Sequence, residues 1–249
     1  MRTAIRTAVA VLSCAASLAF AQDYEREKRW ADEVAPGVVV GDAVWIEAGS
    51  GRKFLALYAP VKGAKDAVVI VHGLGVHPDY GVNGVLRSKL ADLGHTTLSI
   101  QMPVLAVVAK ADDYAPVIPD AVDRIARAAA WLRERSPGAK LVLVTHSVGS
   151  WMGNAYLEGA AASPYRAWVC LGRSGPFTGG VRAIRQPTLD VYADDDFNAV
   201  LESADARRKA LAAAPGSKQL VIAGTDHYFA RKEDELARAI DGWLAGVLR

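Results

Sequence analysis

The segment Thr145-His146-Ser147-Val148-Gly149 holds a serine whose surroundings suit nucleophilic chemistry. Ser147 follows a short apolar run and precedes a run with helical spacing, so its hydroxyl is expected on a tight turn above a sheet edge. The following helix would offer backbone N–H groups to a developing oxyanion. The pattern is Gly-x-Ser-x-Gly, except that the bulkier Thr145 replaces the first glycine. Because a serine before a helix can also act only as an N-cap, the motif alone leaves both roles open.

A histidine and an acidic loop follow Ser147 in the chain order expected for a Ser-His-acid triad on a strand-to-helix turn. His227 could accept the serine proton and return it to a leaving group. Asp196 is our choice for the carboxylate that orients this histidine, with Asp195 and then Asp194 as alternatives. The three adjacent acids could instead form a solvated loop or a cation site.

Apolar, strand-like runs alternate with helix-like runs along the chain. This alternation predicts one α/β domain, residues 22–249, with a mostly parallel sheet and helices on both faces. The interval between 171 and 188 is too short for a large lid domain. The candidate triad residues each follow a predicted strand, at the carboxyl edge where open sheets build their sites. We expect strands at 38–40, 43–47, 53–58, 67–72, 96–100, 141–144, 167–171, 188–192 and 220–223, and helices at 22–36, 83–93, 120–135 (with Asp120 as N-cap), 148–157, 199–214 and 233–247.

The segments VVIVHGLGVHPDY, HTTLSIQMPVL, LVLVTHSVGS and PTLDVYADDD resemble the α/β-hydrolase superfamily, and most of all a poorly characterised, exported bacterial branch of it. The resemblance extends over essentially all of residues 22–249. It implies the α/β-hydrolase fold and a Ser-His-acid framework, with the backbone N–H groups of Leu74 and Val148 as the oxyanion hole. Thr145 departs from the family pattern, as does Ala193, where a glycine is common.

A substrate pocket is expected around the loop that follows the strand at 67–72. A metal cluster of His72, His77 and Asp79 is an alternative use of this loop, but we expect no metal site. The sequence has neither a P-loop nor a Gly-x-Gly-x-x-Gly after a strand, so we expect no nucleotide or other cofactor. The predicted pocket residues are His72, Gly73, His77, Tyr80 and His146, and we expect His72 to have a structural role as a hydrogen-bonding partner of the loop backbone.

The N-terminus has the pattern of a secretory signal peptide. Arg2 and Arg6 precede an uncharged, apolar run, and Ala19-Phe20-Ala21 fits a signal-peptidase site. A membrane anchor is the weaker alternative because the run is short of the ~20 residues that span a bilayer. Acylation of Cys14 is another alternative. Cleavage after residue 21 predicts a periplasmic or secreted protein without stable membrane insertion.

The amino-acid composition limits the classes of binding partner that we expect for this protein. Loss of the two signal arginines from 29 basic residues leaves 27, equal to the 27 acidic residues, so the mature formal charge is zero. No basic stripe with interleaved aromatic residues is present, and nucleic-acid binding is not expected. Cys170 would be the mature protein's single cysteine, and we expect it to be buried in a strand. The oligomeric state stays open.

Two functions fit these observations. The first is an exported serine hydrolase, esterase-like, that cleaves an ester or related acyl bond of a small-molecule substrate through an acyl-enzyme. The second is a non-catalytic protein of the same fold that binds a ligand or a partner in the cell envelope, because fold does not fix function. The departure at Thr145 keeps the second alternative open.

Overall fold

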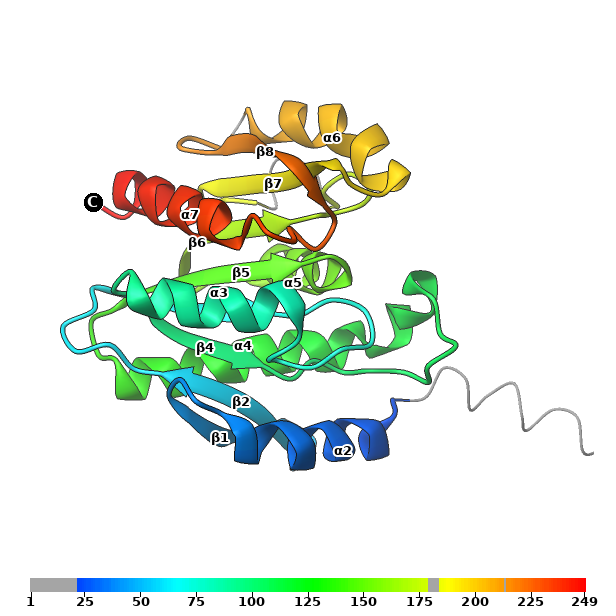
Figure 1. The fold of residues 1–249 in the computed structure, drawn as a ribbon, viewed down its shortest axis with the longest axis vertical. Coiled ribbons are helices and arrows are strands. Elements are labelled where there is room, and N and C mark those ends of the chain that lie inside the picture. The colour runs from blue at the N-terminus through cyan, green and yellow to red at the C-terminus, as the bar shows by residue number, and fades with distance from the viewer. Residues whose placement is uncertain (1–21, 179–183, 213) are drawn as a thin grey trace, which may run out of the picture.

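The computed structural model describes residues 22–178, 184–212 and 214–249; the predicted signal segment, residues 1–21, lies outside them. The chain forms an eight-stranded sheet in the order β1-β2-β4-β3-β5-β6-β7-β8 (Figure 1). β2 runs antiparallel to β1 and to β4, and all neighbours from β4 to β8 are parallel. The strands are β1 (Asp42–Glu47), β2 (Lys53–Ala59), β3 (Asp66–Val71), β4 (Thr96–Ile100), β5 (Lys140–His146), β6 (Tyr165–Leu171), β7 (Thr188–Asp195) and β8 (Lys218–Asp226).

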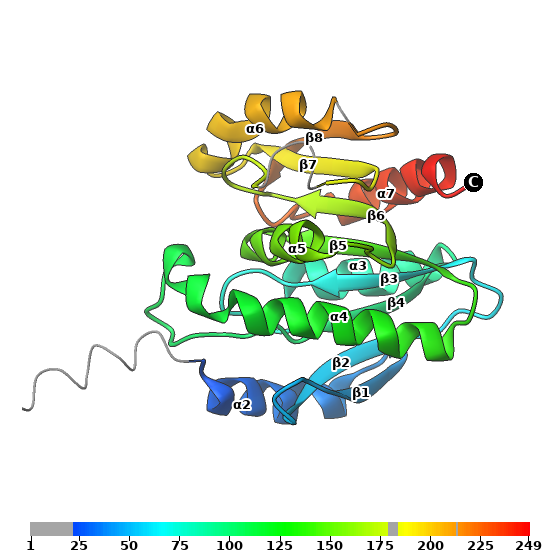
Figure 2. The same cartoon turned by 180° about the vertical axis from the view of Figure 1, so that it is seen from behind.

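Helices cover both faces of this sheet, as Figures 1 and 2 show from opposite sides. α3 and α7 lie on one face, and α4 and α5 lie on the other. The predicted α/β architecture is therefore confirmed. The helices are α2 (Tyr24–Val34), α3 (Gly81–Asp92), α4 (Ile118–Arg135), α5 (Val148–Gly159), α6 (Asn198–Leu211) and α7 (Glu233–Val247), with 3₁₀ helices η1 (Ala35–Gly37) and η2 (Ala111–Val117).

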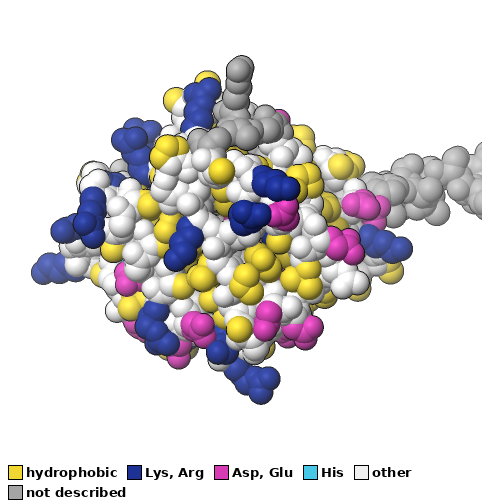
Figure 3. Space-filling model, turned by 90° about the horizontal axis from the view of Figure 1, so that it is seen from above, with side chains coloured by type: hydrophobic (Ala, Val, Ile, Leu, Met, Phe, Trp, Pro, Cys, Tyr) yellow, Lys and Arg dark blue, Asp and Glu magenta, His cyan; other side chains and the backbone are white. Residues whose placement is uncertain are grey.

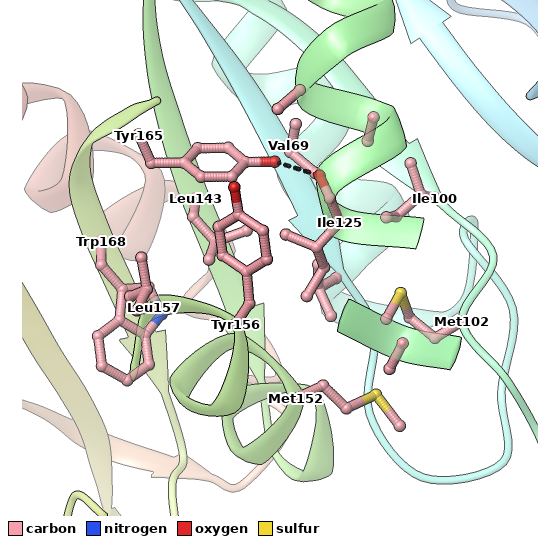
Figure 4. Packing of buried hydrophobic residues seen from close by; sticks show 14 of the residues in the cluster. Val69, Ile100, Met102, Ile125, Leu143, Met152, Tyr156, Leu157, Tyr165 and Trp168 are labelled. Carbon is pink, nitrogen blue, oxygen red and sulfur yellow. Dashed lines mark hydrogen bonds between the residues drawn. The ribbon is translucent and has the colours of Figure 1, made fainter. Parts of the chain in front are cut away.

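The core has two layers, one on each side of the sheet. Side chains alternate along β3, so that Val69 and Val71 pack towards α4 and α5 while Val68 and Ile70 pack towards α3 and α7. A strand buried on both faces needs this unbroken β-branched sequence. Figure 4 shows the α4–α5 layer, where the Tyr165 hydroxyl donates to the Ile125 carbonyl at 2.9 Å.

Most predicted elements are present, but two details were wrong. Residues 38–40 are not a strand; they connect η1 to β1. The helix predicted from 120 begins at Ile118, with Val117 rather than Asp120 at the N-cap position. Pro119 explains the early start, because proline is favoured in the first turn of a helix, where its missing N–H costs nothing. Between β6 and β7, the described residues contain no helix or strand, in agreement with the predicted absence of a large lid.

Two buried polar groups lie in the strands beside the site. Cys170 is buried as predicted, and burial raises the pKa of its thiol to about 12, so it is not a reactive thiolate.

Asp190 in β7 forms an ion pair with Arg207 of α6. Arg207 Nε donates to Asp190 Oδ2 at 2.9 Å, and both side chains are fully buried. Gln219 of β8 also donates to Asp190. This network fixes α6 against the last two strands.

The surface at the β8 and α6 end carries mixed charges (Figure 3). Basic and acidic side chains are interspersed there, with hydrophobic side chains between them, so this face has no field of a single sign. Within residues 22–249, the parts that the structure describes include no helix with the length and hydropathy of a membrane span.

Candidate active site

Ser147 lies on a strained turn between β5 and α5. Its backbone angles, φ 56° and ψ −126°, place a non-glycine residue at positive φ, which persists only where the surroundings enforce it. Ser147 occupies the N-cap position of α5, but its side chain makes no capping hydrogen bond, which argues against the N-cap role. The residue is partly exposed. The turn therefore presents the serine in the manner of a nucleophile elbow.

Close backbone packing explains the glycines around this turn. A Cβ on Gly73 would lie 2.8 Å from the Ser147 Cβ, and one on Gly149 would lie 2.4 Å from the His72 carbonyl oxygen. Both distances are shorter than real side chains tolerate, so the loop after β3 and the first turn of α5 approach each other only because both residues are glycine.

Thr145, the departure from the usual motif, is fully buried beneath the turn. Its hydroxyl accepts a hydrogen bond from Trp168 Nε1 at 2.9 Å and lies 3.0 Å from the Ser150 hydroxyl. A Cβ on Gly153 of α5 would lie 2.7 Å from the Thr145 methyl group, so a glycine one turn into the helix makes room for the extra bulk. Thr145 is thus accommodated without loss of the turn at Ser147.

His227 and Asp196 form a buried pair. His227 Nδ1 donates to Asp196 Oδ1 at 2.6 Å, and the carboxylate also accepts from the backbone N–H groups of Phe197 at 2.8 Å and Ala193 at 3.3 Å. Asp194 instead accepts from the Gly224 N–H on the surface, and Asp195 is exposed. The geometry therefore singles out Asp196 from the three adjacent acids.

The His227 ring is enclosed on several sides. The ring of Phe197 lies 4.3 Å away between centroids, and the ring of His146 lies 4.9 Å away on another side. His146 Nε2 also donates to the His227 carbonyl at 3.0 Å. Gly172 has φ +54°, and a Cβ there would lie 2.8 Å from His227 Cε1. Meanwhile His227 Nε2 is buried and has no hydrogen-bond partner among the described residues.

A cavity of about 230 Å³ joins these groups. Its lining includes Ser147 and His227 together with three of the predicted pocket residues, Gly73, Tyr80 and His146. None of the lining side chains is Asp, Glu, Lys or Arg. The complete lining is Gly73, Leu74, Val76, Tyr80, Val82, Asn83, His146, Ser147, Phe197, His227 and Tyr228.

His72, predicted to lie in the pocket, does not line this cavity. It is fully buried beneath the loop, where Nδ1 donates to the Gly73 carbonyl at 2.9 Å and Nε2 accepts from the Met102 N–H at 2.9 Å. Burial lowers the pKa of His72 to about 3, so the ring is neutral and acts as a structural hydrogen-bonding group.

His77 is also absent from the cavity lining. Its ring packs between Trp30 and Tyr80, with both centroids 5.6 Å away. Asp79, the third member of the alternative metal cluster, pairs with Arg87 at 3.1 Å. No group of three potential metal-ligating side chains occurs in the described portion of the chain.

His146, which does line the cavity, is neutral like His72, because burial lowers its pKa to about 4.

The two proposed oxyanion donors come from the two segments that meet at Ser147, the loop after β3 and the start of α5. Val148 begins α5, where first-turn N–H groups have no partner within the helix. Leu74 follows Gly73, the residue that contacts the serine so closely. Neither N–H donates to another described residue. Both are therefore available to an oxygen atom bound near the serine.

Sequence reasoning missed three residues that shape the site. Phe197 stacks on His227, and its position next to Asp196 was the available signal. Gly172 follows β6, so its place at the carboxyl edge of a central strand could have identified it. Gly153 was also missed as the compensation for Thr145, because helix packing across one turn is not visible in the motif itself.

Solved structures similar to this chain are α/β hydrolases. An Agrobacterium tumefaciens protein of unknown function, described as a candidate α/β hydrolase, has a TM-score of 0.66 at 18% identity, covering 83% of this chain and 96% of that one. Dienelactone hydrolase from Anabaena variabilis has a TM-score of 0.65 at 21% sequence identity, and the match covers 83% of this chain and 97% of that one. An esterase from Pyrococcus furiosus has a TM-score of 0.65 at 12% identity, and the match covers 84% of this chain and 91% of that one. The protein therefore has the α/β-hydrolase fold.

By sequence, residues 25–121 match a family described as "Protein of unknown function (DUF3530)". No curated protein sequence matches the chain. The matched segment extends from α2 into α4 and includes the Leu74 loop, but it ends before Ser147. This agrees with the predicted resemblance to a poorly characterised branch of the α/β hydrolases.

Proposed function

We propose that the protein is a serine hydrolase, esterase-like, that cleaves an ester or related acyl bond of a small molecule. The observation that carries the proposal is the Asp196–His227 pair: it leaves His227 Nε2 without a hydrogen-bond partner among the described residues, and His227 lines the same cavity as Ser147 on its strained turn. A non-catalytic binding protein has no need for a buried carboxylate and imidazole arranged in this way beside a strained serine.

In the proposed reaction, Ser147 Oγ attacks the carbonyl carbon while His227 Nε2 takes the hydroxyl proton. The N–H groups of Leu74 and Val148 stabilise the oxyanion. The tetrahedral intermediate collapses, and His227 returns the proton to the departing alcohol. Water, deprotonated by the same imidazole, then attacks the acyl-serine, and as the second tetrahedral intermediate collapses His227 returns the proton to Ser147 Oγ and the carboxylic acid is released. Asp196 holds the ring and stabilises its charged form throughout.

The cavity limits the substrate in this proposal. Its small volume, about 230 Å³, and its lack of charged lining side chains favour an uncharged ester with a short acyl group. The proposed location is periplasmic or secreted, with residues 1–21 removed as a signal peptide. Nucleic acid and cofactors have no part in the proposed chemistry.

Hydrolysis of p-nitrophenyl esters of increasing acyl length tests this function. We expect activity on acetate and butyrate esters, falling for longer chains, and a loss of at least ~10³-fold in kcat for Ser147→Ala. Ser174→Ala is the matched control, because Ser174 is also partly exposed and, among the described residues, its one hydrogen bond is from Trp151 Nε1 to its backbone carbonyl. Equal activity of wild type and Ser147→Ala would refute the proposed nucleophile, and inactivity on every ester would favour the binding-protein alternative.

A further inference from the structure

The loop of residues 72–76 carries the Leu74 N–H, but the Leu74 side chain does not anchor it. Leu74 is 38% exposed and lines the cavity. Gly73 and Gly75 on either side have no side chains with which to hold the loop. The direction of the Leu74 N–H must therefore be set by hydrogen bonds to the rest of the loop backbone.

Both ends of the loop are held from beneath the sheet edge. The His72 ring bonds to the Gly73 carbonyl and to the Met102 N–H, each at 2.9 Å. Gln101 Nε2 lies 3.0 Å from His72 Nε2 and donates to the Val76 carbonyl at 3.3 Å. These contacts leave the Gly75 carbonyl, one residue past Leu74, to be held from elsewhere.

Arg26, which comes from the N-terminal helix α2, binds that carbonyl. Its Nη2 donates to the Gly75 oxygen at 2.8 Å, and its Nη1 donates to the Leu105 oxygen at 2.8 Å. The guanidinium group thus bridges the loop after β3 and the loop after β4. Gly75 has φ +60°, a conformation that favours glycine, and a Cβ there would be in ordinary van der Waals contact with Nη1 at 3.5 Å.

Arg26 is itself fixed in place. Its guanidinium group lies 4.5 Å above the Trp30 ring, and its backbone N–H donates to the N-cap residue Asp23 at 2.9 Å. α2 is joined to the loop after β4 a second time, because the Asp23 N–H donates to the Val104 carbonyl at 2.7 Å. The helix therefore acts as a rigid support from which the guanidinium group reaches both loops.

We propose that Arg26 is a positioning residue for the oxyanion hole: by bridging Gly75 and Leu105 it keeps the Leu74 N–H directed towards Ser147. This inference rests on the proposed hydrolase function. Arg26 does not line the cavity, so it acts through the backbone of the loop and not on the substrate. The two Nη groups of a planar guanidinium match two carbonyls at once, whereas a lysine ammonium is a single point charge.

Kinetics on p-nitrophenyl acetate and fluorophosphonate labelling rates, for wild type, Arg26→Met and Arg26→Lys, test this role. We expect a decrease of about 10- to 100-fold in kcat and in the labelling rate for Arg26→Met, less than full removal of one oxyanion donor. KM should change little, because the interaction acts in the transition state. Arg26→Lys should recover part of the loss. Arg29→Met, on the exposed side of α2, should match wild type.

Hydrogen exchange of the backbone amides of residues 72–80 gives a readout that does not depend on catalysis. Arg26→Met should accelerate exchange in this segment, and Arg29→Met should not. Unchanged exchange, or a labelling rate within threefold of wild type for a folded Arg26→Met, would overturn the proposal. A wild type that fails to label at all would refute the hydrolase function and with it the catalytic role of Arg26, while exchange would still decide whether Arg26 holds the loop.

Discussion

The His227 imidazole is oriented by Asp196 through a hydrogen bond of 2.6 Å, and the carboxylate is fixed in turn by the backbone N–H groups of Phe197 and Ala193. Replacement of Asp196 by Asn keeps the shape but removes the charge and allows the wrong tautomer of the imidazole. We expect Asp196→Asn to lower kcat by about 10⁴-fold with a small change in KM.

Asp195→Asn is the matched control for this measurement. Asp195 is adjacent and exposed, so its substitution removes the same charge without touching His227. Wild-type kinetics for Asp195→Asn are expected. A similar loss for both variants would mean that the general negative charge of the loop, and not the Asp196–His227 bond, supports activity.

We predict that activity requires a glycine at position 172, because any side chain there would clash with the His227 ring. Gly172→Ala places a Cβ 2.8 Å from His227 Cε1 and should displace the ring, with a loss of about 10²-fold in kcat. Gly175→Ala shares the positive φ, and its Cβ would meet no atom of the described residues within 4 Å, so both variants carry the backbone strain of about 1–2 kcal/mol. If Gly175→Ala loses as much activity as Gly172→Ala, strain and not the contact with His227 is responsible.

Thr145 and Gly153 should be energetically coupled. Gly153→Ala brings a Cβ to 2.7 Å from the Thr145 methyl group, and we expect it to lower the free energy of unfolding by about 1–3 kcal/mol. In a Thr145→Ser variant the methyl group is absent, but the hydroxyl that accepts the hydrogen bond from Trp168 is kept. In that background, Gly153→Ala should leave the free energy of unfolding nearly unchanged. Denaturant unfolding of the four proteins measures the coupling. If the effects of Gly153→Ala and Thr145→Ser on the free energy of unfolding are additive, α5 accommodates the added Cβ whether or not the Thr145 methyl group is present.

His95 should make stability depend on pH. Burial alone would lower its pKa, but hydrogen bonds and charge from Asp66 at 2.6 Å and Asp241 of α7 at 3.1 Å outweigh burial and raise it above 6.5. A raised pKa in the folded state means that the stabilisation is complete below pH 6.5 and is lost as the pH rises through the raised value.

Chemical denaturation of wild type and His95→Gln across pH 5–9 measures this contribution. The free energy of unfolding of wild type should fall above pH 6.5 relative to that of the variant. Parallel pH profiles would rule out His95 as the titrating group. Because His95 lies at the start of β4, away from the catalytic edge, the activity of the folded variant should be unchanged.

Much of the fold could be predicted from sequence because buried parallel strands have a clear signal. The unbroken apolar sequence of β3 and the abrupt turn at Ser147 locate the sheet edge, and the order of Ser147, Asp196 and His227 then fixes which loops meet. Residues 38–40 were mistaken for a strand because a short apolar run looks alike in a strand and in a connection.

The side-chain environment could not be predicted in the same way. His72 and His77 belong to the expected loop, but whether a loop side chain faces the cavity or the interior depends on partners far away in sequence, such as Met102 and Trp30. The same holds for Arg26, which precedes Gly75 by 49 residues. Contacts of this kind are set by tertiary packing and leave no local pattern.

Labelling with a fluorophosphonate probe, followed by peptide mass spectrometry, tests the central claim most directly, since an activated serine oxygen attacks the phosphorus of such a probe, displaces fluoride and becomes phosphonylated. Wild type should gain one adduct, on Ser147, and the labelling rate should fall strongly in His227→Ala, since the imidazole takes the proton. Ser147→Ala should not label, and Ser174→Ala should label like wild type. An adduct on another residue, or equal labelling of wild type and Ser147→Ala, would contradict the assignment of Ser147 as the nucleophile.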